Sequence, residues 1–250
     1  MIEDDKKGAA RDISQELPRR FYKQVSVKLV ETGFAPALDG RLPKSPGMAQ
    51  LIVPTEALAT LLVEEWDAQV EVINHATMPA VRLAFTAIDR VGQVRAEMAD
   101  EVARYGGSDV ICYLADAPAG LAEAEALVWQ PWIDWAANAL GVNLAPVHGV
   151  IHRPQPPQAL ERLRDLAISE NDFVLSGLAY GAALYGSAIL AFAVWRGVVD
   201  GVEALEISRF DENFQIERWG LDDEAAARRG GMERDAVMLG RWFAALRRPA

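Results

Sequence analysis

The sequence contains a single cysteine, Cys112, among its 250 residues, so no disulfide bond can form within the chain. This scarcity agrees with a reducing compartment. Cys112 lies between Ile111 and Tyr113 in an apolar stretch, a setting typical of a buried thiol. We therefore expect Cys112 to be a structural residue.

Basic residues are also in short supply. The chain has 25 Lys and Arg against 36 Asp and Glu, which gives a net charge of -11. An acidic surface repels phosphate backbones and anionic lipid headgroups. Nucleic acid and membrane surfaces are therefore not expected as partners, whereas a basic protein surface or a cationic ligand fits the charge.

No targeting segment is recognisable at the N-terminus, which begins Met-Ile-Glu-Asp-Asp-Lys-Lys. A secretory signal needs an apolar core, and a transit peptide is rich in Arg and poor in acidic residues. We expect residues 1–17 to form a disordered, solvated tail. We expect the protein to stay in the compartment where it is made.

Motifs for nucleotide binding and hydrolysis are missing as well. There is no Gly-x-Gly-x-x-Gly fingerprint and no Gly-x-Ser-x-Gly elbow. Residues 181–187 have the glycine spacing and final Ser of a phosphate-binding loop, but they lack its Lys and lie in a helical run. The glycines there are better explained by close helix packing, so no cofactor is expected.

Two of the three histidines could form a metal site. His148 and His152 stand four apart, the spacing of two ligands on one helix face. Several prolines surround them, which argues against a helix and favours ordinary structural or surface histidines. We expect no metal. A metal-dependent hydrolase that uses these histidines with nearby carboxylates is kept as the alternative function.

The hydrophobic pattern changes its period along the chain. Alternating residues in 21–30, a second extended segment at 34–38 and a short apolar run at 51–53 predict strands, and Asp39-Gly40 is a hairpin dipeptide. From residue 54 onward the spacing is helical. The prediction is an α+β fold, with a β-rich N-terminal domain at 18–92 that has helices at its end. A mostly α-helical C-terminal domain follows at 93–250.

Several helices can be placed from apolar spacing. Leu58, Leu62 and Trp66 define one helical ridge, and similar spacing recurs near residues 78–88, 121–135, 160–167 and 232–246. Pro131 is expected to start a new helix, because proline favours the first turn.

Residues 173–195 contain no charged side chain, and the stretch is long enough to span a bilayer. A helix that is apolar on all sides can equally form the core of a larger soluble fold. We favour one or two buried helices, broken near Gly186-Ser187, and no stable membrane insertion.

Tryptophan occurs among acidic residues in two helical segments, 64–69 and 211–220. Aromatic residues beside charges are typical of protein interfaces, where they act as anchors. They are also typical of ordinary cores. The residues alone support both interpretations equally.

A set of motifs in a fixed order resembles a known family. They are Arg20 to Lys23, Leu38 to Pro46, Pro54-Thr55, Glu65 to Gln69, Met78-Pro79, Arg82-Leu83, Asp109 to Tyr113, Trp132 to Trp135, Leu175 to Leu178 and Asp211 to Gly220. Together, over roughly residues 19–248, they resemble the F-type ATP synthase assembly chaperones that bind the alpha subunit of the F1 sector. This family includes the mitochondrial assembly factor 2 proteins and their bacterial relatives.

The resemblance implies a small β domain followed by a helical domain. It also implies that the chain binds the unassembled alpha subunit and passes it to the beta subunit. Eukaryotic relatives would act in the mitochondrial matrix, whereas the lack of a recognisable transit peptide here suggests a bacterial, cytoplasmic member. A non-enzymatic, ATP-independent chaperone is thus the predicted function.

We place the partner-binding site on the acidic segment near the C-terminus, at Asp211, Glu212, Gln215 and Glu217. Phe214 and Trp219 are expected to pack beneath that segment and fix it. Trp66 shares the ridge of Leu58 and Leu62, so a structural role at the domain junction is expected for it.

Overall fold

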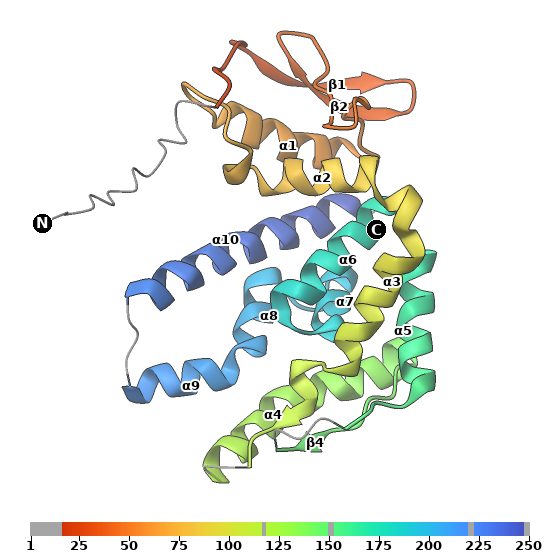
Figure 1. Ribbon diagram of the computed structural model, residues 1–250, viewed down its shortest axis with the longest axis vertical. Coiled ribbons are helices and arrows are strands. Elements are labelled where there is room, and N and C mark those ends of the chain that lie inside the picture. Colours follow the sequence, from red (N-terminus) through yellow and green to blue (C-terminus); the bar gives the residue numbers. More distant parts are fainter. Residues whose placement is uncertain (1–16, 117–118, 150–152, 220–222, 248–250) are drawn as a thin grey trace, which may run out of the picture.

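The computed structural model describes residues 17–116, 119–149, 153–219 and 223–247 (Figure 1). Nearly all of the predicted tail, 1–17, therefore lies outside the described residues. The order of the principal elements is β1 (Val25–Val30), β2 (Gly33–Leu38), α1 (Glu56–Asp67), α2 (Pro79–Asp89), α3 (Val91–Gly107), β3 (Tyr113–Leu114), α4 (Ala119–Trp135), β4 (Val147–His148), α5 (Pro157–Ser169), α6 (Asp172–Tyr185), α7 (Ala188–Arg196), α8 (Gly201–Ser208), α9 (Phe210–Trp219) and α10 (Asp223–Leu246). Short helical turns lie at His75–Thr77 and Val110–Cys112, and a π-helical turn follows α4 at Ala136–Leu140.

The predicted α+β class is confirmed: a two-stranded antiparallel sheet near the N-terminus precedes a mostly helical remainder. The hairpin of β1 and β2 closes through Glu31-Thr32. Asp39 and Gly40 have φ angles of 47° and 79°, as a tight turn with two left-handed residues requires. The first strand begins at Val25, later than predicted, and the third predicted strand contributes only a bridge between Val53 and Phe34.

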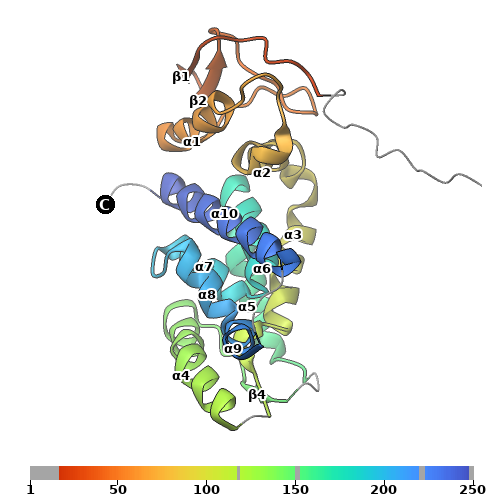
Figure 2. The same ribbon diagram turned by 90° about the vertical axis from the view of Figure 1, so that its left-hand side faces the viewer.

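The hairpin rests on α1, with α2 beside it, at one end of the molecule (Figures 1 and 2). Thr55 caps α1 by accepting a hydrogen bond from the backbone N–H of Leu58. The side chains of Leu58, Leu62 and Trp66 are buried, and the Tyr22 hydroxyl donates to the Trp66 carbonyl over 2.7 Å. The apolar ridge read from the sequence therefore faces the core.

The uncharged stretch forms two separate helices, α6 and α7, as predicted. Gly186 ends α6 in the left-handed conformation, with φ of 62°, and the Ser187 hydroxyl caps α7. Both helices are largely buried against neighbouring helices. Among the helices of the described residues, none is long and apolar enough to cross a membrane.

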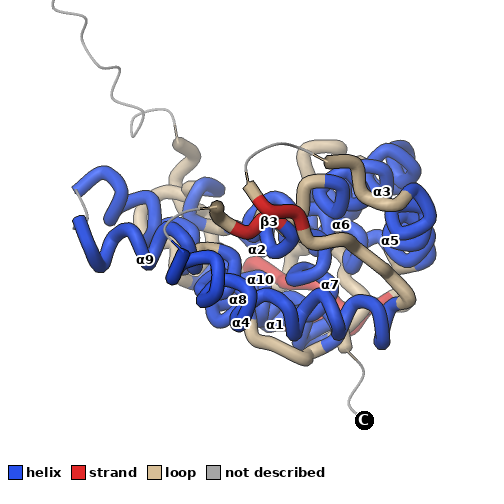
Figure 3. The backbone as a smooth tube through the Cα atoms, turned by 90° about the horizontal axis from the view of Figure 1, so that it is seen from below, coloured by secondary structure: helices blue, strands red, loops and turns tan. Residues whose placement is uncertain are grey.

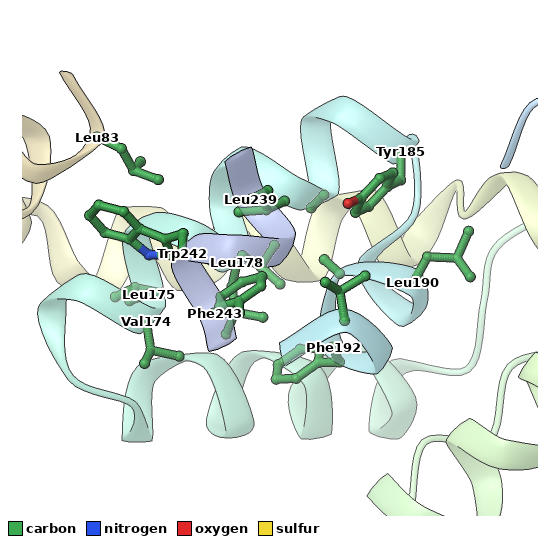
Figure 4. Packing of buried hydrophobic residues seen from close by; sticks show 14 of the residues in the cluster. Leu83, Val174, Leu175, Leu178, Tyr185, Leu190, Phe192, Leu239, Trp242 and Phe243 are labelled. Atoms are coloured by element: carbon green, nitrogen blue, oxygen red, sulfur yellow. The ribbon is translucent and has the colours of Figure 1, made fainter. Parts of the chain in front are cut away.

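Close packing between α6 and α10 requires glycine, as predicted for the segment 181–187. A Cβ atom at Gly181 would lie 2.9 Å from Leu239 Cδ2, and one at Gly177 would lie 2.6 Å from Phe243 Cε1. These side chains, together with Trp242, form the centre of the core in Figure 4. The small residues thus allow the two helices to approach each other.

Helix α10 joins the N-terminal layer to the helical layers below it (Figure 2). The Thr55 hydroxyl donates to the Ala245 carbonyl over 2.8 Å, and Arg241 pairs with Glu64 at 2.7 Å. Helix α3 continues across the predicted domain boundary at 92/93, with a kink at Val94. The division into two domains stays a prediction.

The prediction that Pro131 starts a new helix is wrong, because α4 runs through it. A proline leaves the carbonyl four residues earlier without its usual partner. Here that residue is Leu127, which is 79% exposed, so water can bond the carbonyl. Trp129 and Ile133 bury the opposite face and hold the two halves of α4 in line.

Cys112 is fully buried, as predicted. Burial, together with the nearby Asp109, raises the pKa of its thiol far above the ordinary value. A thiol that does not ionise is unreactive, which agrees with a structural role.

Candidate partner-binding site

Helices α8, α9 and α10 meet at one side of the molecule, away from α3 and α5 (Figures 1 and 3). Asp200 caps α8, and the chain turns at Arg209 to begin α9 at Phe210. The indole N–H of Trp129, on α4, donates to the Ile207 carbonyl over 2.8 Å. This bond fixes the end of α8, and with it the start of α9, against α4.

Arg229 on α10 links all three helices. Its guanidinium donates to Asn213 Oδ1 at 2.6 Å on α9 and to both carboxylate oxygens of Glu206 on α8. It also pairs with Glu233 at 3.2 Å on its own helix. Asn213 in turn donates to Glu206 over 2.8 Å. A planar donor group that satisfies several acceptors holds the helices at a defined separation.

The structure separates the four predicted partner-binding residues. Glu212 and Gln215 are exposed on α9, and Glu212 pairs with Arg209 at 2.5 Å. Asp211 is half-buried, and its carboxylate accepts from the Glu212 N–H over 2.7 Å. The side chain of Glu217 lies outside the described residues. The exposed part of the predicted site is thus the face of Glu212 and Gln215.

The charge of Asp211 acts on a second carboxylate, Glu125. Burial raises the pKa of Glu125 on α4, and the charge of Asp211 raises it further. Glu125 accepts from the Ala115 N–H at 2.6 Å, which partly offsets the cost of its burial. The influence of Asp211 agrees with the packing of α9 beside α4.

The structure describes the side chains of only two of the three residues predicted to support the site. Phe214 is half-buried on α9, and the Trp219 side chain lies outside the described residues. Trp66 is buried in the N-terminal layer, where its ring meets Tyr22 and His75 edge to face. Supporting roles for these three residues stay predictions.

Between α8, α9 and α10 lies a cleft of about 420 Å³. Its apolar lining comes from Leu205, Ile216 and Met232. Charged and amide groups complete the lining: Glu206, Arg209, Glu212, Asn213, Arg228 and Arg229. An apolar floor with a polar rim is the arrangement found at the centre of protein interfaces.

One donor at this cleft has no partner. The Nε atom of Arg209 is buried and makes no hydrogen bond within the described residues, although Nη1 of the same side chain pairs with Glu212. A buried donor without an acceptor costs free energy. An acceptor from a bound partner would remove that cost.

Sequence reasoning missed Glu206, Arg209, Asn213 and Arg229. They lie on three helices and come together only because α10 folds back onto α8, so no local spacing identifies them. The sequence gives one weak indication of this site: Glu206 follows Val202 by four residues, so the two lie on one face of α8.

The histidines of the alternative function do not form a described metal site. His148 is exposed on β4, and His152 lies outside the described residues. The described part of the chain holds no group of three or more His, Cys, Asp or Glu side chains that could bind a metal ion. The residues that the structure describes therefore give no support to a metal-dependent hydrolase.

Comparison with known proteins identifies relatives over almost the whole chain. The family model described as ATP12 chaperone protein matches residues 19–137. The mitochondrial protein atp12 of Schizosaccharomyces pombe is 26% identical over 230 residues, which cover 87% of this chain and 79% of that protein.

Two solved structures have the same fold. Atp12 from Paracoccus denitrificans is 42% identical, with a TM-score of 0.85, and the match covers 92% of this chain and 99% of that one. An Agrobacterium tumefaciens protein is 38% identical, with a TM-score of 0.86 and coverage of 92% and 87%. The fold and these relatives define an assembly chaperone for the F1-ATPase. The chain belongs to the ATP12 chaperone family.

Proposed function

We propose that this protein binds the unassembled alpha subunit of the F1-ATPase and hands it to the beta subunit, without using ATP. We place this activity in the bacterial cytoplasm. The contact surface is the exposed face of α9 with Glu212 and Gln215, together with the adjoining cleft. Asp211 and Glu217 stay predicted members of this surface.

The observation that carries the proposal is the cleft between α8, α9 and α10. It joins an apolar floor to a rim that includes the exposed carboxylate of Glu212 and the unpartnered Nε of Arg209. Such a cleft can take an apolar side chain of a partner while Arg209 binds a carbonyl or carboxylate beside it. The net charge of -11 would steer the encounter toward basic surface.

Release follows from mass action. An orphan subunit exposes interface intended for its neighbours, and such obligate interfaces are largely apolar. A chaperone that covers part of this surface stabilises the subunit, by a free energy that grows with the logarithm of its affinity. The beta subunit offers a larger interface, so it displaces a chaperone of moderate affinity.

The test is capture of separately expressed alpha and beta subunits by the immobilised chaperone. We expect alpha to be retained and beta to be lost. Recovery of beta alone, or of neither subunit, would refute the proposal.

A charge reversal locates the surface. We expect Glu212→Lys to weaken alpha capture about tenfold, because it removes a rim carboxylate and opposes a basic partner, a change of about 1.4 kcal/mol. The matched control is Glu161→Lys, an exposed acid on α5 far from the cleft, which should bind alpha normally. Glu217→Lys tests the part of the segment whose side chain is not described. If Glu212→Lys and Glu217→Lys both bind as wild type does, the site is elsewhere.

A further inference from the structure

Strand β1 has one hydrogen-bonding edge that no described residue covers. Phe34 exchanges both of its backbone hydrogen bonds with Val53, and Leu38 does the same with Arg41. These residues of β2 therefore point their N–H and C=O groups away from β1, and Pro36, between them, has no N–H. In an antiparallel pair, when the N–H and C=O of one residue point away from the partner strand, those of the residue opposite it also point outward, away from the first strand.

The residues of β1 opposite these three are Val25, Val27 and Leu29. Their N–H and C=O groups consequently point away from β2, toward the outer edge of the hairpin. Within the described chain, no backbone or side-chain group bonds them. Leu29 is 71% exposed at the end of this edge. An open edge of this kind is a template for a further strand.

The edge is complementary to itself. If two copies of β1 pair antiparallel about Val27, then Val27 faces its own copy and Val25 faces Leu29 of the other chain. All three outward-pointing residues then fall in hydrogen-bonded pairs, which gives about six backbone hydrogen bonds around the two-fold axis. In this pairing, Val25 of the other copy also covers the exposed Leu29 side chain.

The flanking charges select this register. Lys23 lies in a bend just before β1, and Glu31 lies in the turn just after it. Centring the pair on Val27 brings Lys23 of one copy to the same end of the paired strands as Glu31 of the other, and it does so twice because of the symmetry. Neither residue forms a salt bridge with a described residue of its own chain. Within residues 23–31, centring on Val25 or on Leu29 would bring no opposite charges together. Opposite charges across strands stabilise a pairing and fix its register.

We propose that the free edge of β1 is a self-association surface, through which two copies of this protein form a four-stranded antiparallel sheet. Lys28 is the one charge within the edge, and this register sets it opposite Ser26 instead of opposite its own copy. The strand is only six residues long, so the contact is small and the dimer is weak and concentration-dependent. This surface lies at the far end of the molecule from α9, so the inference is independent of the proposed function.

A charge-swap experiment tests the pairing. The dissociation constant of the purified full-length protein would be measured by sedimentation equilibrium over a range of concentrations. We expect Lys23→Glu or Glu31→Lys alone to raise it about tenfold, because each change replaces two attractive pairs by two repulsive ones. We expect the double variant Lys23→Glu/Glu31→Lys to restore the wild-type value. The Glu161→Lys control should leave the constant unchanged.

A cross-linking experiment reports the register without depending on affinity. Val27→Cys places two thiols across the axis at a separation that a disulfide can span. The native Cys112 is buried, so it does not compete. We expect oxidation to give covalent dimers of Val27→Cys, and none of Lys44→Cys, which lies on the neighbouring loop.

Three results would overturn the proposal. The first is a strictly monomeric protein at every concentration, with no disulfide dimer of Val27→Cys. The second is a dimer whose dissociation constant responds to neither charge reversal. The third concerns the partner. If Val27→Cys instead forms a disulfide with a cysteine-bearing F1 subunit and not with itself, the edge receives a strand of the partner, and self-association is refuted.

Discussion

Replacement of Asp109 by asparagine should stabilise the protein, and more so as the pH rises. Asp109 is fully buried between the end of α3 and the start of α7. Its Oδ2 atom accepts from the Ile189 N–H at 3.1 Å, whereas Oδ1 has no partner among the described residues. Burial is the largest influence on this carboxyl and raises its pKa from 3.8 to about 7, against the opposing effect of hydrogen bonds from Ser187 and the backbone.

The direction of the pH effect follows from proton binding. Between the unfolded pKa of 3.8 and the folded pKa of about 7, the folded protein keeps a proton that the unfolded chain has lost. Raising the pH in this window therefore favours the unfolded state. About two pH units of this window lie above about pH 5, and each unit lowers the free energy of unfolding by about 1.36 kcal/mol. An asparagine side chain has no proton to lose in this range, so the Asp109→Asn variant escapes this loss of stability.

The assay is urea unfolding followed by tryptophan fluorescence from about pH 5 to pH 8.5, with the free energy of unfolding extrapolated to water. We expect the advantage of Asp109→Asn over wild type to widen by about 3 kcal/mol across this range. Glu65 is half-buried and its pKa is also raised to about 7, but its effect is the same in both proteins and cancels in the comparison. The matched control, Asp165→Asn, changes an exposed carboxyl on α5. Parallel curves for wild type and Asp109→Asn would refute the reasoning.

Three further outcomes are expected from the packing and the helix caps. Gly181→Val should lower the free energy of unfolding by about 1–3 kcal/mol, because the added atoms overlap Leu239, and thermal unfolding would measure the loss. Asn171→Ala should cost about 1 kcal/mol by the same measurement, since its side chain accepts from two N–H groups at the start of α6. Arg229→Met should accelerate amide hydrogen exchange in α9, because Arg229 ties α9 to α8, while exchange in α6 should stay as in wild type. If the amides of α9 are protected as well as in wild type, the Arg229 network is dispensable.

Much of the fold could be predicted from local sequence. Alternation identifies the first strand of the hairpin, and the Asp-Gly dipeptide identifies the tight turn that follows β2. Helical spacing identifies α1, α5 and the C-terminal half of α10. The break between α6 and α7 is also local, because Gly186 supplies the left-handed residue and Ser187 supplies the cap. The prediction at Pro131 failed because helix continuity there depends on packing: Trp129 and Ile133 bury one face, and Leu127, whose carbonyl loses its usual partner, is exposed.

The sequence by itself determined the α+β class, the buried nature of the uncharged stretch and, through its ordered motifs, the family. It also directed attention to the acidic segment of α9. Only the tertiary structure decided which of those acids is exposed, because Asp211 is half-buried while Glu212 is exposed and borders the cleft. The cleft, the Arg229 network and the free edge of β1 likewise depend on long-range contacts. Such contacts join residues that are distant along the chain, and hydrophobic periodicity reports only how each element meets the core.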